Sequence, residues 1–119
     1  MVKRAHDEMS KTRQRLAPRL KKLVKALTPY RPDRIYLFGS WASGEADELS
    51  DIDLVVIKST PAPFFERLRE VAKLLPSDFG AIDLLVYTPE EFADMKANGN
   101  AFVEMVEAEG VILYETTRA

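Results

Sequence analysis

Three aspartates occupy positions that could serve metal or phosphate chemistry. Asp51 and Asp53 are two residues apart at the start of a segment rich in strand-forming residues, and Asp83 lies within the apolar segment 81–86. Alternate residues of a strand point to the same face, about 6.5–7 Å apart, so Asp51 and Asp53 could share one divalent cation or hold two. An Asp-x-Asp pattern is also common among loop and capping residues, so this pattern alone is weak evidence.

Asp83 is the more informative carboxylate. Its neighbours are apolar, which predicts a buried side chain, and an unpaired buried carboxylate is costly in free energy. It must therefore be neutralised, paired with a Lys or Arg, or bound to a metal ion. Residues 35–119 hold six Lys and Arg, and the residues alone leave ion pairing and metal ligation equally open.

Gly39 and Ser40 follow an expected strand and precede a segment, 40–46, that could form a short helix. A glycine at this point lets a phosphate approach the backbone, and the free N–H groups of a helix start attract anions. The alternative is that Gly39 only makes the turn and Ser40 caps the helix.

The pattern along the chain predicts alternating helices and strands, which is typical of a layered α/β domain. The expected helices span 18–28, 61–75 (with Thr60 as N-cap), 88–97 (opening with a capping box) and 101–109. The expected strands span 34–38, 51–58, 81–87 and 111–114.

One topology gathers the candidate residues. If Gly39-Ser40 ends the first strand and Asp51 and Asp53 begin the second, they meet only when these strands run antiparallel. Asp83 reaches the same edge when the second and third strands are parallel, and the helix between them is long enough for that crossover. The expected fold is α/β of the α+β type, a small mixed sheet flanked by helices, with a phosphate-binding turn and three carboxylates at one edge.

These motifs resemble those of the DNA polymerase beta-like nucleotidyltransferase superfamily. Gly39-Ser40 is followed after ten residues by Asp-Ile-Asp at 51–53, and later by an apolar strand that carries Asp83. The short length and the run 38–56 are similar to the minimal nucleotidyltransferases, MNT-domain proteins that are often encoded beside a HEPN-domain partner as an antitoxin–toxin pair. The likeness covers roughly residues 30–115.

The resemblance implies a nucleotidyltransferase fold and a role for each matching residue. Asp51 and Asp53 would hold two Mg²⁺ ions that bridge the triphosphate of a nucleotide, expected to be ATP. Asp83 would complete the metal site and help to deprotonate the attacking hydroxyl. Gly39 and Ser40 would contact the triphosphate.

Charge is divided unevenly along the chain. Residues 1–34 hold 11 of the 17 Lys and Arg and three acidic residues, whereas the remainder holds six basic and 16 acidic residues. The basic segment could bind a polyanion, dock on an acidic surface or be a solvated helix face.

Relatives in this family often carry a basic residue where this chain has Ser43. Its absence could weaken nucleotide binding, the basic segment could replace it, or activity could be lost, which the three carboxylates argue against.

The predicted core elements use nearly the whole sequence, so we expect no separate domain that binds the acceptor of the nucleotide. A partner, a second copy or a shallow groove would then hold the acceptor. The resemblance implies transfer of AMP to a hydroxyl, typically a tyrosine, of a HEPN-domain toxin. The alternatives are an antitoxin that masks its partner without catalysis, and a small-molecule nucleotidyltransferase subunit with a separate substrate-binding chain. The acidic body argues against nucleic-acid binding outside the N-terminal segment. The last strand could offer an exposed edge for homo- or hetero-oligomers.

The composition limits the class of protein and the kinds of site that the chain can have. The 119 residues are 46% hydrophobic and 30% charged and include no Cys, which predicts a globular chain without disulfides or thiolate metal sites. A basic helix or arm is expected over 1–17, and a single nucleotidyltransferase domain over 18–119. No segment is apolar enough for a signal peptide or a membrane span, so a cytoplasmic location is expected.

Overall fold

The computed structural model describes residues 18–39, 42 and 51–116. The expected short helix over 40–46, apart from Ala42, lies outside the described residues, and so do Ser40 and Ser43. The basic segment 1–17 lies outside them as well. The division into a basic arm and one domain over 18–119 therefore stays a prediction.

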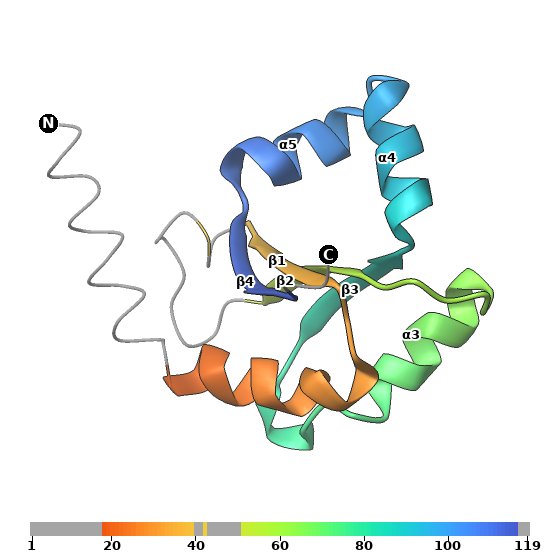
Figure 1. Ribbon diagram of the computed structural model, residues 1–119. Coiled ribbons are helices and arrows are strands. Elements are labelled where there is room, and N and C mark those ends of the chain that lie inside the picture. The colour runs from red at the N-terminus through yellow and green to blue at the C-terminus, as the bar shows by residue number, and fades with distance from the viewer. Residues whose placement is uncertain (1–17, 40–41, 43–50, 117–119) are drawn as a thin grey trace, which may run out of the picture.

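A four-stranded mixed sheet forms the centre of the described structure (Figure 1). The strands lie in the spatial order β3-β2-β1-β4, with β1 antiparallel to both β2 and β4, and β2 parallel to β3. Their bounds are β1 Arg34–Phe38, β2 Ile52–Ile57, β3 Ile82–Tyr87 and β4 Val111–Glu115. The antiparallel first pair and the parallel second pair confirm the predicted topology, whereas the place of β4 beside β1 was not expected from the sequence.

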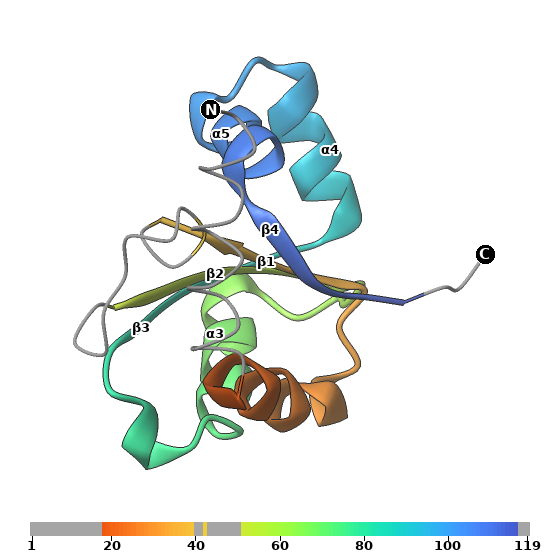
Figure 2. The same cartoon turned by 90° about the vertical axis from the view of Figure 1, so that its left-hand side faces the viewer.

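Helices cover both faces of this sheet (Figure 2). One face carries the helix over residues 18–27 together with α3 (Phe64–Ala72), and the other carries α4 (Pro89–Ala97) and α5 (Ala101–Glu109). Among the helices of the described residues, none has the length and apolar character needed to cross a membrane.

The two layers of helices explain the uninterrupted apolar run of β2. Ile52, Leu54 and Val56 belong to the core on the side of helix 18–27 and α3. Val55 and Ile57 belong to a second core, formed with side chains of α4 and α5. Successive strand residues point to opposite faces, so a strand whose every position is apolar fits between two layers.

The structure corrects the predicted start of α3. The sequence predicts a helix over 61–75 with Thr60 as N-cap, but α3 begins at Phe64, with Pro63 in extended conformation as its N-cap. A residue that precedes proline is disfavoured in the helical region, which keeps the helix from beginning earlier. The Thr60 hydroxyl instead accepts a hydrogen bond from the backbone N–H of Ala62 at 3.1 Å.

The starts of the last two helices confirm the prediction. At the start of α4, the Thr88 hydroxyl accepts from the backbone N–H of Glu91 at 3.1 Å, and the Glu91 carboxylate accepts from the backbone N–H of Thr88 at 2.9 Å. This reciprocal pair is the predicted capping box, which satisfies two N–H groups that have no partner within the helix. In α5, Asn100 caps the helix by accepting from the N–H of Val103.

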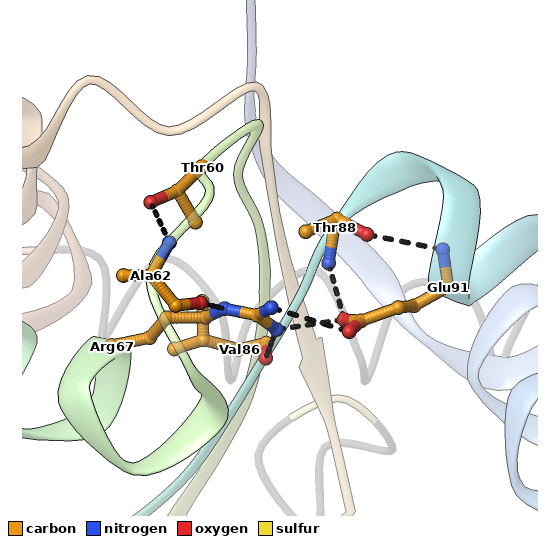
Figure 3. Close-up of polar contacts among 6 residues, drawn as sticks. All are labelled: Thr60, Ala62, Arg67, Val86, Thr88 and Glu91. Carbon is orange, nitrogen blue, oxygen red and sulfur yellow. Dashed lines mark hydrogen bonds and ion pairs between the residues drawn. The ribbon is translucent and has the colours of Figure 1, made fainter.

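Arg67 of α3 joins this capping box to the rest of the fold (Figure 3). Its side chain is buried, and its guanidinium donates to both carboxylate oxygens of Glu91, at 2.7 and 3.2 Å. The same guanidinium donates to the backbone carbonyls of Ala62 and Val86. One ion pair therefore ties together α3, the end of β3 and the first turn of α4, and the hydrogen bond from Arg67 lowers the pKa of Glu91.

We predict that Glu91→Gln lowers the free energy of unfolding by about 1–2 kcal/mol at neutral pH. Glutamine can keep the capping box, but it leaves the buried Arg67 guanidinium without its countercharge. The expected loss is at the low end for a buried pair because the side chain of Glu91 is 44% exposed and partly screened by water. Urea unfolding of both proteins measures the difference.

The difference in unfolding free energy between wild type and Glu91→Gln should depend on pH. A carboxylate whose pKa is lowered by folding stabilises the protein above the ordinary glutamate range, and this contribution is lost as the pH falls through the folded-state pKa. The difference between wild type and Glu91→Gln should therefore shrink in acid. Glu90→Gln, at an exposed neighbouring position, is the control and should change stability by less than about 0.5 kcal/mol. An equal loss in both variants would contradict the role given to the ion pair.

Candidate functional site

Asp53 and Asp83 lie side by side on neighbouring strands. They are register partners in the parallel pair of β2 and β3, so both side chains point to the face of the sheet that carries α4 and α5. The side chain of Asp83 lies close enough to that of Asp53 to raise the pKa of the Asp53 carboxyl group.

The surroundings of Asp53 disfavour a negative charge on it. Asp53 is half-buried, and burial raises the pKa of its carboxyl group. The close approach and negative charge of Asp83, and the negative charge of Asp51, raise this pKa further. Like charges this close favour either a shared proton or a cation between them.

Asp83 is exposed, so its predicted burial is wrong. β3 is an edge strand of the sheet, and Asp83 is its second residue, where the side chain reaches water. None of the ion pairs found among the described residues includes Asp83. The contact that it makes is with another acid, which favours a cation site over the ion-pair alternative.

Asp51 stands beside this pair without joining it. It is exposed, precedes the first residue of β2, and acts on Asp53 through its charge. Within the part of the chain that the structure describes, no three His, Cys, Asp or Glu side chains gather into a group that could hold a metal ion. The structure thus brings Asp53 and Asp83 together, and the metal-binding role of all three aspartates stays a prediction.

Gly39 brings the turn after β1 against Asp53. The preceding residue, Phe38, is the antiparallel register partner of Asp53, and Gly39 has a φ of 73°. The left-handed backbone conformation favours glycine, and a Cβ at position 39 would lie 2.3 Å from Oδ2 of Asp53, so the carboxylate would have to turn away. Ser40 is not among the described residues, and phosphate contact by Gly39 and Ser40 stays a prediction.

An aromatic pair that the sequence did not single out begins beside Asp53. Phe38 lies opposite Asp53, and its ring makes an edge-to-face contact with Phe102 of α5, with ring centroids 5.3 Å apart. Both rings are half-buried. The position of Phe38 at the end of a strand, next to Gly39, was a usable signal, whereas nothing local to Phe102 indicated that α5 would reach this end of the sheet.

The donor set at this edge fits a magnesium ion. Mg²⁺ prefers hard oxygen ligands and is typically held by one or two carboxylates together with phosphate oxygens of a substrate. Asp53 and Asp83 provide two adjacent carboxyl groups, and Asp51 adds negative charge close by. The adjacent carboxyl groups support this fit, because a cation between them would relieve the repulsion between their charges.

A comparison with known protein families shows to which family the chain belongs. The profile of the family described as "Polymerase beta, Nucleotidyltransferase" matches residues 21–119. The chain belongs to this family. The match spans all four strands and the three aspartates, so the predicted resemblance is confirmed, and the chain is a member of a family of nucleotidyltransferase enzymes. No curated protein sequence matches it.

Solved structures of nucleotidyltransferases share its fold, which confirms the predicted fold class. A protein from Sulfolobus solfataricus described as a nucleotidyltransferase has a TM-score of 0.60 at 19% identity, covering 94% of this chain and 91% of its own. A toxin-antitoxin solved with AMP-PNP has a TM-score of 0.59 at 27% identity, covering 82% and 74%. A mutant of the toxin-antitoxin MntA-HpeT has a TM-score of 0.55 at 26% identity, covering 82% and 72%.

We predict that Gly39→Ala is more destabilising than Gly99→Ala. Both glycines have a φ of 73°, but a Cβ at Gly99 would meet nothing within 4 Å. Both variants should lose about 1 kcal/mol to backbone strain, and Gly39→Ala should lose about 0.5–1.5 kcal/mol more because the Asp53 carboxylate must leave its rotamer to avoid the new Cβ. Thermal or urea unfolding of the two variants measures the difference.

A double-mutant cycle isolates the cause. In an Asp53→Ala background the carboxylate is gone, so the extra cost of Gly39→Ala should largely disappear. If that extra cost persists in this background, the contact with Asp53 is not its source.

Proposed function

We propose that this nucleotidyltransferase transfers a nucleoside monophosphate, AMP from ATP, to a hydroxyl group of a partner protein, and that it is the antitoxin of a pair whose toxin carries a HEPN domain. The observation that carries the proposal is the carboxyl pair of Asp53 and Asp83 directly beside Gly39, in a chain of this family.

The similarity to toxin-antitoxin structures supports the partner and the nucleotide. Two of the structures that share this fold are toxin-antitoxins at 26% and 27% identity, and one of them was solved with AMP-PNP, an ATP analogue. A protein acceptor fits the exposed position of Asp83 on the edge strand β3, where the surface of another protein can reach it. A cytoplasmic location belongs to the same proposal.

Each residue of the site has a defined part in this reaction. Asp51, Asp53 and Asp83 would hold magnesium, which when bound neutralises phosphate charge and activates the attacking hydroxyl. Gly39 and Ser40 would contact the triphosphate through their backbone N–H groups, and the absence of a side chain at Gly39 leaves the phosphates room to approach Asp53.

Our proposal gives the proton of the acceptor hydroxyl to Asp83. It is exposed, whereas Asp53 is half-buried, so an acceptor hydroxyl can approach Asp83 from solvent. The hydroxyl oxygen forms a bond to the α-phosphorus while the bond from that phosphorus to the bridging oxygen breaks, and pyrophosphate leaves. The hydroxyl proton passes to the carboxylate of Asp83.

The experiment incubates the chain with magnesium, α-labelled ATP and the protein encoded beside it, and follows label on that protein. Label should appear with the wild type and fall at least about a hundredfold, equivalent to ~2.7 kcal/mol of transition-state stabilisation, in Asp51→Asn, Asp53→Asn and Asp83→Asn. Asp94→Asn, at an exposed position on α4, is the matched control and should transfer label normally. If all three variants still neutralise the partner without transferring label, the chain is a masking antitoxin.

We further predict that metal binding depends on the same carboxyl pair. Isothermal titration with Mn²⁺, in the presence of a non-hydrolysable ATP analogue, should show a loss of affinity of about tenfold or more in Asp53→Asn and Asp83→Asn. Asp94→Asn should bind as the wild type does. Chelation of the metal should abolish label transfer, and added Mg²⁺ should restore it. Transfer that survives chelation would contradict the proposed chemistry.

A further inference from the structure

β4 leaves one edge of the sheet open among the described residues. It pairs with β1 on one side, and no described strand pairs with it on the other, since the order is β3-β2-β1-β4. Half of the N–H and C=O groups of such an edge strand point outward and can pair with another extended segment. This edge lies on the far side of the sheet from β3 and its carboxylate Asp83.

An apolar groove runs along this edge, between β4 and the helix over residues 18–27, which lies below it in Figure 2. The groove has a volume of about 430 Å³. Its apolar lining comes from both elements and from β1, through Leu20, Val24, Leu37, Val111 and Leu113. On the opposite face of β4, Ile112 is 49% exposed, so apolar surface lies on both sides of the open edge.

Two lysines give the groove a positive rim. Lys21 and Lys25 are four residues apart, so they project from the same side of helix 18–27, and both line the groove and are exposed. Neither has an acidic partner within the residues that the structure describes. Their charge selects the occupant of the groove, because it favours carboxylates at the rim and disfavours cations.

The charge argues against two other occupants. Residues 1–17 contain five Lys and Arg and two acidic residues, so the positive rim would repel them. Two copies paired antiparallel through β4 would carry their 18–27 helices on the same face of a continuous sheet. The lysines of both rims would then face one seam, where like charges repel.

We propose that the open edge of β4 and its groove bind an extended segment of a partner protein by strand addition. The segment is apolar where its side chains enter the groove, and it carries Asp or Glu where it meets Lys21 and Lys25. Backbone hydrogen bonds to β4 give affinity in this mode, and the groove and its charged rim give specificity. The surface lies apart from the carboxyl pair, so the proposal does not depend on nucleotidyl transfer.

The test uses the full chain and a fluorescein-labelled peptide in which valine and threonine alternate and glutamates stand at both ends. Fluorescence anisotropy should show binding that weakens as salt is added. A peptide with lysines in place of the glutamates should bind at least about tenfold more weakly, because two favourable charge contacts are lost and repulsion replaces them.

A charge-swapped variant makes the test specific. Lys21→Glu combined with Lys25→Glu should reverse the preference, so that the lysine peptide binds at least about tenfold more tightly than the glutamate peptide. Lys73→Glu, at an exposed position beyond the end of α3, is the matched control and should leave the preference unchanged. NMR amide shifts on addition of the glutamate peptide should concentrate in β4 and helix 18–27.

Four results would overturn the proposal. The first is no binding of the glutamate peptide, and the second is binding whose preference the charge-swapped variant does not reverse. The third is dimerisation through β4, seen as a molecular mass in solution that doubles as the protein concentration rises. If Leu113→Glu restores the mass of the monomer, the edge binds a second copy of the chain. Deletion of residues 1–17 should leave peptide affinity unchanged. A gain of tenfold or more on deletion would show that this segment occupies the groove.

Discussion

The parallel register of β2 and β3 sets Asp53 opposite Asp83, and the rest of the site depends on this pairing of like charges. The cost of holding two carboxyl groups in contact is met by the apolar side chains that follow on both strands and pack into two cores. The turn at Gly39 approaches the same carboxylate because β1 runs antiparallel on the other side of β2. A single central strand therefore aligns every described part of the site, and the apolar packing on both strands outweighs the repulsion at its acidic end.

Local chemistry was enough to predict most of the elements. The bounds of β1 and α5 agree with the sequence prediction, because Gly39, Asn100 and Gly110 mark their ends with residues typical of turns and caps. The pairing of β1 with β2 and of β2 with β3 could also be predicted, since it was the arrangement that gathered the candidate residues. α3 was predicted too long because the two prolines before it were given less weight than the apolar spacing beyond them.

What the sequence could not supply depends on contacts between distant segments. An apolar strand such as 111–115 fits either edge of the sheet, so its place beside β1 had no local signal. The exposure of Asp83 was missed for a related reason, because the apolar neighbours that suggest a central strand also occur on an edge strand packed by helices. Phe102 contacts Phe38 only because α5 packs against β1, and the spacing of residues within α5 does not predict that packing.

The alternation of side chains along β3 limits how this protein can change over evolution. Asp83 is flanked by Ile82 and Leu84, which pack against the core on the opposite face. Gain or loss of one residue inside β3 would exchange the two sets, moving the carboxylate into the core and a large aliphatic side chain to the acidic edge. The connection between α3 and β3 can change length without this exchange, because it leaves unaltered which side chains of β3 lie beside Asp53.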